Sequence, residues 1–219
     1  MDKKYILFDL DGTVADSSQG IFDCVRYALS HFGVEEPDDE KLRHFVGPPL
    51  TKGFADHCPY LTEDEVNFCV EKYREKYKTQ GVYSCKAYEG MEELFSALQK
   101  AGKEIYISTL KPEPFAKIMI EHLGLSKYVS GVHGVDFKGE IHDKCAVINN
   151  TLKEHNITDL SRCVMIGDRK SDVIGAREAG IDAIGVLFGF GGNDEFDGTT
   201  VWRIAREVSD LEKILIKNT

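Results

Sequence analysis

The sequence predicts an α/β protein whose core is a doubly wound parallel sheet, with a helical unit inserted close to the N-terminus. Three observations support this fold class. A continuous apolar run at residues 5–8 leads directly into two carboxylates. From Asp16 to about Ala87 the chain then carries only helical patterns. After Tyr88, short apolar runs alternate with amphipathic stretches, a pattern that favours parallel βαβ units.

The first apolar run is typical of a strand buried on both faces. Asp9 and Asp11 follow it two residues apart, so strand geometry starts both side chains on one side. Gly12 allows a sharp turn and exposes backbone amides. Because parallel sheets bind ligands at the carboxyl ends of their strands, this acidic pair predicts a Mg²⁺ site. One carboxylate could attack an electrophile while the other moves a proton. Asp-x-Asp alone also fits a plain acidic turn.

The inserted segment is predicted to consist of helices, interrupted at residues 45–50, where paired prolines exclude a regular helix. Its first helix has apolar residues at helical spacing, with Asp16 or Ser17 as the cap and Gly33 as the stop. Thr62 and Glu65 form a capping-box pattern in front of a second long helix. We therefore predict two domains: a core of residues 1–15 and 87–219, and an α-helical bundle cap of residues 16–86.

The rest of the chain alternates between strands and helices, which completes the expected Rossmann-like core. Ser209 to Glu212 form a second capping-box pattern, which predicts a C-terminal helix. The other predicted elements are strands at residues 105–107, 129–135, 164–166 and 183–187, and helices at 91–101, 115–123, 145–155 and 174–179.

Composition agrees with a soluble globular protein, since 42% of the residues are apolar and 29% are charged. The net charge of −10 disfavours nucleic acids and anionic membranes as partners. The six cysteines form no Cys-x-x-Cys pair, and we see neither a targeting segment nor a membrane span. These features predict a cytoplasmic protein with reduced thiols, and we expect it to be a monomer or homodimer.

The string FDLDGTV at residues 8–14 is more specific than its acidic pair. It resembles the first motif of the haloacid dehalogenase superfamily. The resemblance implies that Asp9 is a nucleophile that takes up a phosphoryl group. It implies that Asp11 protonates the leaving alcohol and later activates water. The dehalogenase branch lacks the second aspartate, so its presence points to phosphoryl transfer. We expect Gly12 and Thr13 to contact the substrate.

Two further motifs of that family are matched loosely. Thr109 aligns best with the hydroxyl residue that binds phosphate, with Ser108 as the alternative; either could also be a simple turn residue. Lys144 stands at the head of a predicted helix, where anions are favoured, and is our candidate for the motif-three lysine. Lys111 and Lys138 are the rivals, and a solvated lysine is the plain alternative.

The fourth motif is matched closely by VMIGDRKSD at residues 164–172. A strand leads into Gly-Asp, and a second aspartate follows four residues later. The resemblance implies that Asp168 is a metal ligand and that Asp172 is a direct or water-mediated one. With Asp9 and the backbone carbonyl of Asp11, these residues would hold Mg²⁺.

Two loops have open roles. Gly189 to Asn193 follow a strand without the spacing of a nucleotide fingerprint, and we expect a mobile loop beside the site. In the inserted segment, Gly47, Pro48 and Lys52 could face the active site, or could form a plain turn between helices.

The sequence thus predicts a Mg²⁺-dependent phosphomonoesterase that acts on a small phosphorylated metabolite through an aspartyl phosphate. It looks most like the phosphoglycolate phosphatase-like branch of the superfamily. Phosphoglycolate, a nucleoside monophosphate and a sugar phosphate all fit as substrates. The alternatives are therefore a 5'-nucleotidase and a sugar phosphomutase, and a non-catalytic interaction module is more remote because every acidic motif position is intact.

Overall fold

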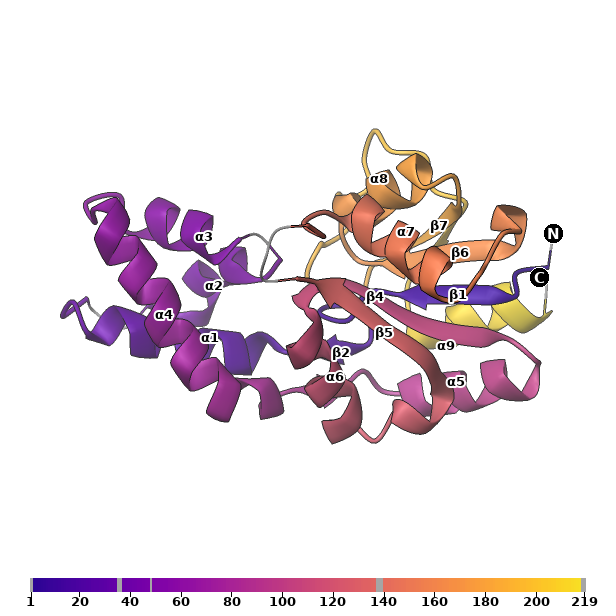
Figure 1. The fold of residues 1–219 in the computed structure, drawn as a ribbon, viewed down its shortest axis with the longest axis horizontal. Coiled ribbons are helices and arrows are strands. Elements are labelled where there is room, and N and C mark those ends of the chain that lie inside the picture. Colours follow the sequence, from indigo (N-terminus) through magenta and orange to yellow (C-terminus); the bar gives the residue numbers. More distant parts are fainter. Residues whose placement is uncertain (1, 35–36, 48, 137–139, 218–219) are drawn as a thin grey trace. The chain divides into compact units, whose positions relative to one another are not determined.

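The computed structural model of the chain describes residues 2–34, 37–47, 49–136 and 140–217. The chain forms two compact units (Figure 1): a core unit, Met1–Asp16 with Ala87–Thr219, and a helical unit, Ser17–Lys86. These bounds differ by one residue, at Asp16, from the domains that the sequence predicts. That the helical unit acts as a cap remains a prediction.

The core unit is built on a six-stranded sheet of order β5-β4-β1-β6-β7-β8, in which every paired neighbour is parallel. In chain order this is the 3-2-1-4-5-6 arrangement of a doubly wound, Rossmann-like fold. The predicted fold class is confirmed. The strands are β1 (Tyr5–Phe8), β4 (Glu104–Pro112), β5 (Val129–Val135), β6 (Cys163–Gly167), β7 (Asp182–Val186) and β8 (Arg203–Ala205).

Helices cover both faces of this sheet (Figure 1). The α7 and α8 helices pack together on one face, and α5, α6 and α9 lie on the other. This division follows from right-handed crossovers that run first towards β5 and then back towards β8. The core helices are α5 (Met91–Lys100), α6 (Glu113–His122), α7 (Lys144–Glu154), α8 (Lys170–Glu178) and α9 (Val208–Glu212).

Alternate side chains of β1 serve the two faces. Leu7 belongs to a buried cluster with Ile148 of α7 and Val173 of α8. Phe8 meets Phe95 of α5, with ring centroids 5.0 Å apart. Because strand side chains alternate between faces, the side chain of Asp9 leaves on the Leu7 side, towards α7 and α8.

Two features at the C-terminal end differ from the sequence prediction. The edge strand β8 is not among the predicted elements. The predicted start of the last helix is wrong, because α9 begins at Val208 and its capping box is formed by Glu207 and Asp210 rather than by Ser209 and Glu212.

The helical unit contains α1 (Ser18–Ser30), α2 (Asp39–Leu42), α3 (Leu50–His57) and α4 (Glu63–Thr79), with α4 packed against α1 and α3. The predicted capping box of α4 is confirmed: Glu65 Oε2 accepts from the amide of Thr62, whose hydroxyl accepts from the amide of Glu65. A separate two-stranded sheet, β2 (Ala15–Asp16) and β3 (Lys86–Ala87), lies where the chain passes between the units.

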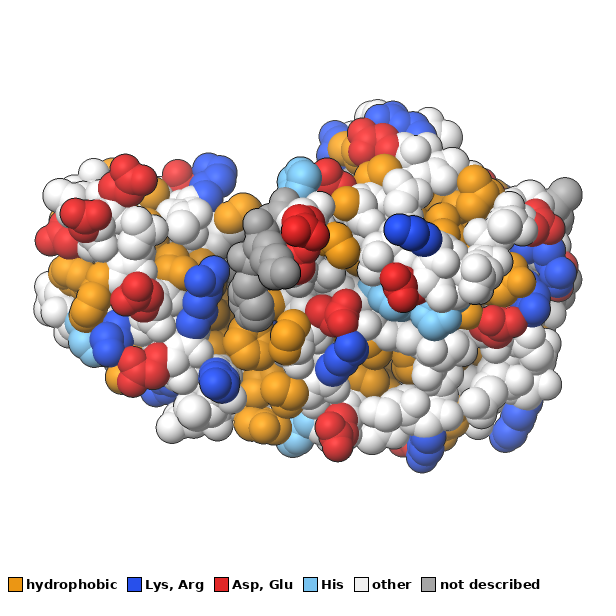
Figure 2. Space-filling model, viewed as in Figure 1, with side chains coloured by type: hydrophobic (Ala, Val, Ile, Leu, Met, Phe, Trp, Pro, Cys, Tyr) orange, Lys and Arg blue, Asp and Glu red, His pale blue; other side chains and the backbone are white. Residues whose placement is uncertain are grey.

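The surface is chemically mixed. On the face drawn in Figure 2, lysine and arginine side chains are interspersed with aspartate and glutamate rather than gathered in one basic patch. All six cysteines carry free thiols, and four of them are buried. Within the described ranges, none of the helices is both long enough and apolar enough to cross a membrane.

Candidate active site

The site is centred on the carboxyl ends of β1 and β6, neighbouring strands in the middle of the sheet. Phe8 and Ile166 are in register, and the Asp9 amide donates to the carbonyl of Ile166 at 2.8 Å. Asp9 therefore leaves its strand beside Asp168. From here the winding runs outwards in opposite directions, which opens the crevice where doubly wound sheets bind ligands.

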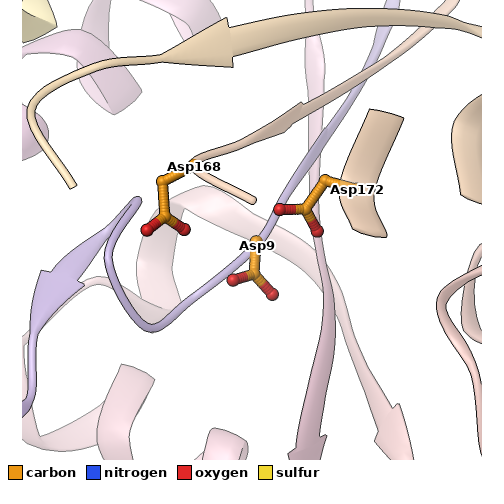
Figure 3. Close-up of side chains that lie close together, drawn as sticks. All are labelled: Asp9, Asp168 and Asp172. Atoms are coloured by element: carbon orange, nitrogen blue, oxygen red, sulfur yellow. The ribbon is translucent and has the colours of Figure 1, made fainter. Parts of the chain in front are cut away.

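Three carboxylates converge at this point (Figure 3). Asp9 follows β1, Asp168 follows β6 and Asp172 lies in the first turn of α8. One oxygen atom from each lies within 4.8 Å of the other two, and all three residues are buried. Three carboxylate oxygens this close together are suitable ligands for Mg²⁺, which prefers hard oxygen donors. The structure thus brings together the three side chains that the sequence predicts as metal ligands.

A buried lysine lies among these carboxylates. The Nζ atom of Lys144 is 2.6 Å from Asp9 Oδ1, 2.7 Å from Asp172 Oδ1 and 3.0 Å from the carbonyl oxygen of Ser108. Its position follows from the start of α7, where the Asp143 side chain accepts from the amide of Ala146 and fixes the helix end. Lys144 is therefore the described lysine that pairs with the predicted nucleophile.

The rival lysines have different surroundings. Lys111 Nζ lies 2.7 Å from Asp11 Oδ2, so it pairs with the second carboxylate of the first motif rather than with Asp9. Lys138 lies outside the described residues.

Burial and crowding shift the ionisation of the cluster. Burial, reinforced by Asp172 and only partly opposed by the Lys144 ammonium, raises the pKa of Asp9 to about 6. Burial and the neighbouring carboxylates of Asp9 and Asp172 raise the pKa of Asp168 to about 7. Burial alone would lower the pKa of Lys144, but Asp172 and Asp9 outweigh it and raise that pKa. A divalent cation would relieve this crowding of negative charge.

The turn after β1 packs against Asp168. Gly12 has φ +84°, and a Cβ there would lie 2.3 Å from Asp168 Oδ2, so glycine is required on both counts. The Gly12 amide donates to the carbonyl of Ala15 at 2.9 Å, so it is already used within the turn. The buried hydroxyl of Thr13 donates to Asp168 Oδ1 at 3.3 Å. Thr13 thus orients a candidate metal ligand, and its predicted substrate contact stays a prediction.

The two hydroxyl candidates at the end of β4 differ. The Ser108 hydroxyl shares a 2.8 Å hydrogen bond with Thr151 of α7, inside the protein. Thr109 Oγ1 accepts from the amide of Lys111 at 3.2 Å and is also buried. Thr151 donates its own proton to the carbonyl of Val147 at 2.9 Å, so the Ser108 hydroxyl donates to Thr151. The Thr109 hydroxyl only accepts in its hydrogen bond and can still donate to a phosphate oxygen, so Thr109 remains the better phosphate-binding candidate.

The sequence interpretation missed one contributor to the site. The Phe190 amide donates to Asp168 Oδ2 at 2.8 Å. A Cβ at Gly189 would lie 2.4 Å from the Cβ of Asp168, and one at Gly191 would lie 2.0 Å from its carbonyl oxygen. The available signal was the repeated glycine itself, which marks a close approach of backbone. The loop expected beside the site is there, and its backbone holds Asp168.

The candidate residues of the helical unit, Gly47 and Lys52, are described by their contacts and backbone geometry inside that unit. Gly47 has φ +106° and precedes α3. Lys52 is exposed on α3 and pairs with Asp56 one turn later, at 2.6 Å. Pro48 lies outside the described residues. Their predicted orientation towards the active site stays a prediction.

Fold and site together define a class: a doubly wound α/β protein with a buried acidic cluster at the switch point of its sheet. The chain belongs to the haloacid dehalogenase-like hydrolase family, whose family model matches residues 6–186. The predicted superfamily and enzyme class are both confirmed.

Relatives cover most of the chain. It is 34% identical to a 5'-nucleotidase of Pseudomonas aeruginosa, over 96% of this chain and 94% of that protein. It is 32% identical to the tyrosine-protein kinase PtkA of Mycobacterium tuberculosis, over 96% of this chain and 72% of that protein. A phosphoglycolate phosphatase of Agrobacterium fabrum is 28% identical, over 84% and 80%.

The fold is shared with solved structures. A protein from Clostridium acetobutylicum described as a predicted phosphatase is 34% identical, with a TM-score of 0.90 over 99% of this chain and all of the other. The relatives include the branch that the sequence resembles, which confirms that resemblance.

Proposed function

We propose that the protein is a Mg²⁺-dependent phosphomonoesterase that acts on a small phosphorylated metabolite through a phosphorylated Asp9. The observation that carries this proposal is the pairing of buried Asp9 with Lys144 inside the acidic cluster. A carboxylate held by a cation beside candidate metal ligands can approach an anionic phosphate without prohibitive repulsion. Asp11, two residues further on, is available for proton transfer.

In the proposed reaction, Asp9 attacks the phosphorus in line and Asp11 protonates the leaving oxygen. Lys111, 2.7 Å from Asp11, restrains that carboxylate. Lys144 balances charge on Asp9 and the phosphoryl group, and Thr109 offers a hydroxyl for a phosphate oxygen. Asp11 then takes a proton from water, and that water cleaves the acyl phosphate and restores Asp9.

The donor set fits a hard cation. Carboxylate oxygens of Asp9 and Asp168, with the carbonyl of Asp11, would hold Mg²⁺, and Asp172 would act directly or through water. Bound there, the ion would supply charge neutralisation at the transferring phosphoryl group.

We propose that the protein is located in the cytoplasm, in line with its net charge of −10 and its free thiols.

Two classes of phosphomonoester are the main candidate substrates. The sequence resembles the phosphoglycolate phosphatase-like branch, which makes phosphoglycolate the first candidate. The relative named 5'-nucleotidase has the higher identity and covers nearly the whole chain, which favours a nucleoside 5'-monophosphate as the second. Another relative is named as a tyrosine-protein kinase. Membership of the family therefore does not by itself determine which molecule accepts the phosphoryl group.

The test is a phosphomonoester panel with Mg²⁺, read by release of inorganic phosphate. It should include phosphoglycolate, the nucleoside 5'-monophosphates and hexose phosphates. The proposal expects phosphate release that stops in excess chelator and returns when Mg²⁺ is added. An isomerised sugar phosphate without phosphate release would establish a mutase instead, and full turnover in chelator would remove the metal assignment.

A further inference from the structure

We propose that Glu195 is a positioning residue for Asp168. It fastens the loop of residues 189–195 to the start of α8, and so holds the Phe190 amide against the Asp168 carboxylate. The proposal rests on the proposed function in one respect, since it takes Asp168 as a ligand of Mg²⁺.

One end of the loop lies against Asp168. The Phe190 amide donates to Asp168 Oδ2 at 2.8 Å. Gly189 packs so closely that a Cβ there would lie 2.2 Å from the carbonyl oxygen of Gly12. The loop backbone therefore contacts both the fourth motif and the turn after β1. Small movements of this backbone would change the direction of the Asp168 carboxylate.

The other end of the loop is tied down by the Glu195 side chain. Glu195 Oε1 accepts from the amide of Lys170, the first residue of α8, at 2.7 Å. Its Oε2 lies 3.6 Å from a terminal nitrogen of Arg169, whose Nε is 3.9 Å from Asp168 Oδ2. A carboxylate at a helix N-terminus is also favoured by the helix dipole. Glu195 thus joins the loop to the residues that directly follow Asp168.

The loop also folds back under this anchor. A Cβ at Gly191 would lie 2.8 Å from Glu195 Cγ and 2.0 Å from the Asp168 carbonyl oxygen. The glutamate stem and the Asp168 backbone therefore enclose Gly191 from two sides. Loss of the Glu195 carboxylate would release this end of the loop and raise the entropy cost of holding Phe190 in place.

Partners of metal ligands tune metal affinity, and their removal typically costs about 10–100-fold. Glu195 acts one step further out, through Phe190 and Arg169, so we expect an effect of about 10-fold. A simple helix cap would behave differently. It would change the free energy of unfolding and leave Mg²⁺ affinity and the Phe190 amide untouched.

The experiment measures Mg²⁺ affinity by calorimetry, without substrate, and hydrogen exchange at the Phe190 amide in the metal-free protein. Glu195→Ala should weaken Mg²⁺ binding about 10-fold and speed Phe190 exchange. Glu195→Gln keeps an acceptor for Lys170 but loses the ion pair with Arg169, so it should fall between. Glu92→Gln, at an exposed glutamate paired with Lys127, is the charge-matched control and should match the wild type.

Unchanged Mg²⁺ affinity together with unchanged Phe190 exchange in Glu195→Ala would overturn the proposal, whether or not stability falls. If Glu195→Ala does not fold, Glu195→Gln carries the same comparison. If the wild-type protein binds no Mg²⁺, the metal part of the proposed function fails. Exchange at Phe190 in the metal-free protein then still decides whether Glu195 holds the loop.

Discussion

Lys144 Nζ lies 2.6 Å from Asp9 Oδ1, although 135 positions separate the two residues in the chain. Both side chains are buried, and a buried carboxylate without a partner is strongly unfavourable. The topology makes this pairing possible, because β1 and the start of α7 meet at the same edge of the sheet. The pair therefore links the fold directly to the proposed chemistry.

We expect Lys144→Met to lower kcat by about 10²–10³, the usual effect of losing one group that stabilises transition-state charge. The metal-free variant should also unfold more easily, by about 3–5 kcal/mol, because Asp9 and Asp172 lose their buried partner. Steady-state kinetics and urea unfolding measure the two effects. Lys153→Met, an exposed lysine on the same helix, is the control. A kcat close to that of the wild type would rule out Lys144 as the motif-three lysine.

The two later aspartates should differ in metal binding. Asp172 Oδ1 forms an ion pair with Lys144 at 2.7 Å, and Asp172 Oδ2 accepts a hydrogen bond from the Arg169 amide at 3.0 Å. Both carboxylate oxygens of Asp172 therefore have partners within the protein. Asp168 accepts hydrogen bonds from the neutral donors Thr13 and Phe190, and the Nε atom of Arg169 lies farther away, 3.9 Å from its Oδ2. We therefore predict that Asp168→Asn weakens Mg²⁺ binding more than Asp172→Asn. Calorimetry on both variants decides, and the reverse order would contradict this assignment.

Removal of the helical unit tests the prediction that this unit is a cap that selects the substrate. A core of residues 1–16 joined to 87–219 by a short Gly/Ser linker keeps Asp9, Asp11, Lys144 and Asp168. It should still hydrolyse p-nitrophenyl phosphate, but should discriminate less between natural phosphates, because closure of a lid selects substrates and excludes water. The readout is the ratio of kcat/KM between good and poor substrates, after circular dichroism has verified the fold. An equal ratio in both proteins would place specificity in the core.

A histidine pair on β5 and α7 predicts a pH effect on stability. His133 and His155 lie with Nε2 atoms 2.9 Å apart. Burial first, and His155 next, lower the pKa of His133, while Glu113 and Glu154 raise it and Lys117 lowers it. The folded state therefore binds this proton more weakly than the unfolded chain, and stability should fall as the pH drops below about 6.5.

The matched variant for this effect is His133→Gln, which keeps a polar side chain without the titration. Between pH 8 and pH 5 the wild-type protein should lose more unfolding free energy than the variant, by urea unfolding at each pH. His122→Gln, an exposed histidine of α6, is the control. Equal losses in wild type and His133→Gln would exclude His133 as the cause.

Much of the fold was predictable because its signals are local. The apolar run before Asp9 and the one before Asp168 each predict a buried strand. The aspartate that follows each strand predicts that the two carboxylates lie together at the carboxyl ends of the sheet. β8 was not predictable in this way. It has three residues, one of them the exposed Ile204, which is too short for a periodic signal. The start of α9 was misplaced because Ser209 is a favoured cap residue and Glu207, the residue used, is not.

The contacts around the site were harder to predict because they depend on tertiary register. Asp9, Lys144 and Asp168 could be identified from motifs, since each residue type carries its own chemistry. The amide of Phe190 has no side-chain signature, and the anchoring of Glu195 depends on how its loop returns to α8. Lys111 was a rival candidate for the lysine beside Asp9, and its pairing with Asp11 could not be predicted because it depends on how β4 pairs with β1.

The most direct test of the proposed covalent mechanism uses Asp11→Asn with p-nitrophenyl phosphate and Mg²⁺. This leaving group needs no proton, so Asp9 should still take up the phosphoryl group, whereas hydrolysis should slow by about 10²–10⁴ without the base. We predict a burst of one equivalent of p-nitrophenol and, after borohydride reduction of the quenched protein, homoserine at position 9 by mass spectrometry. No burst and an unmodified Asp9, or a phosphoryl group on another residue, would contradict the account.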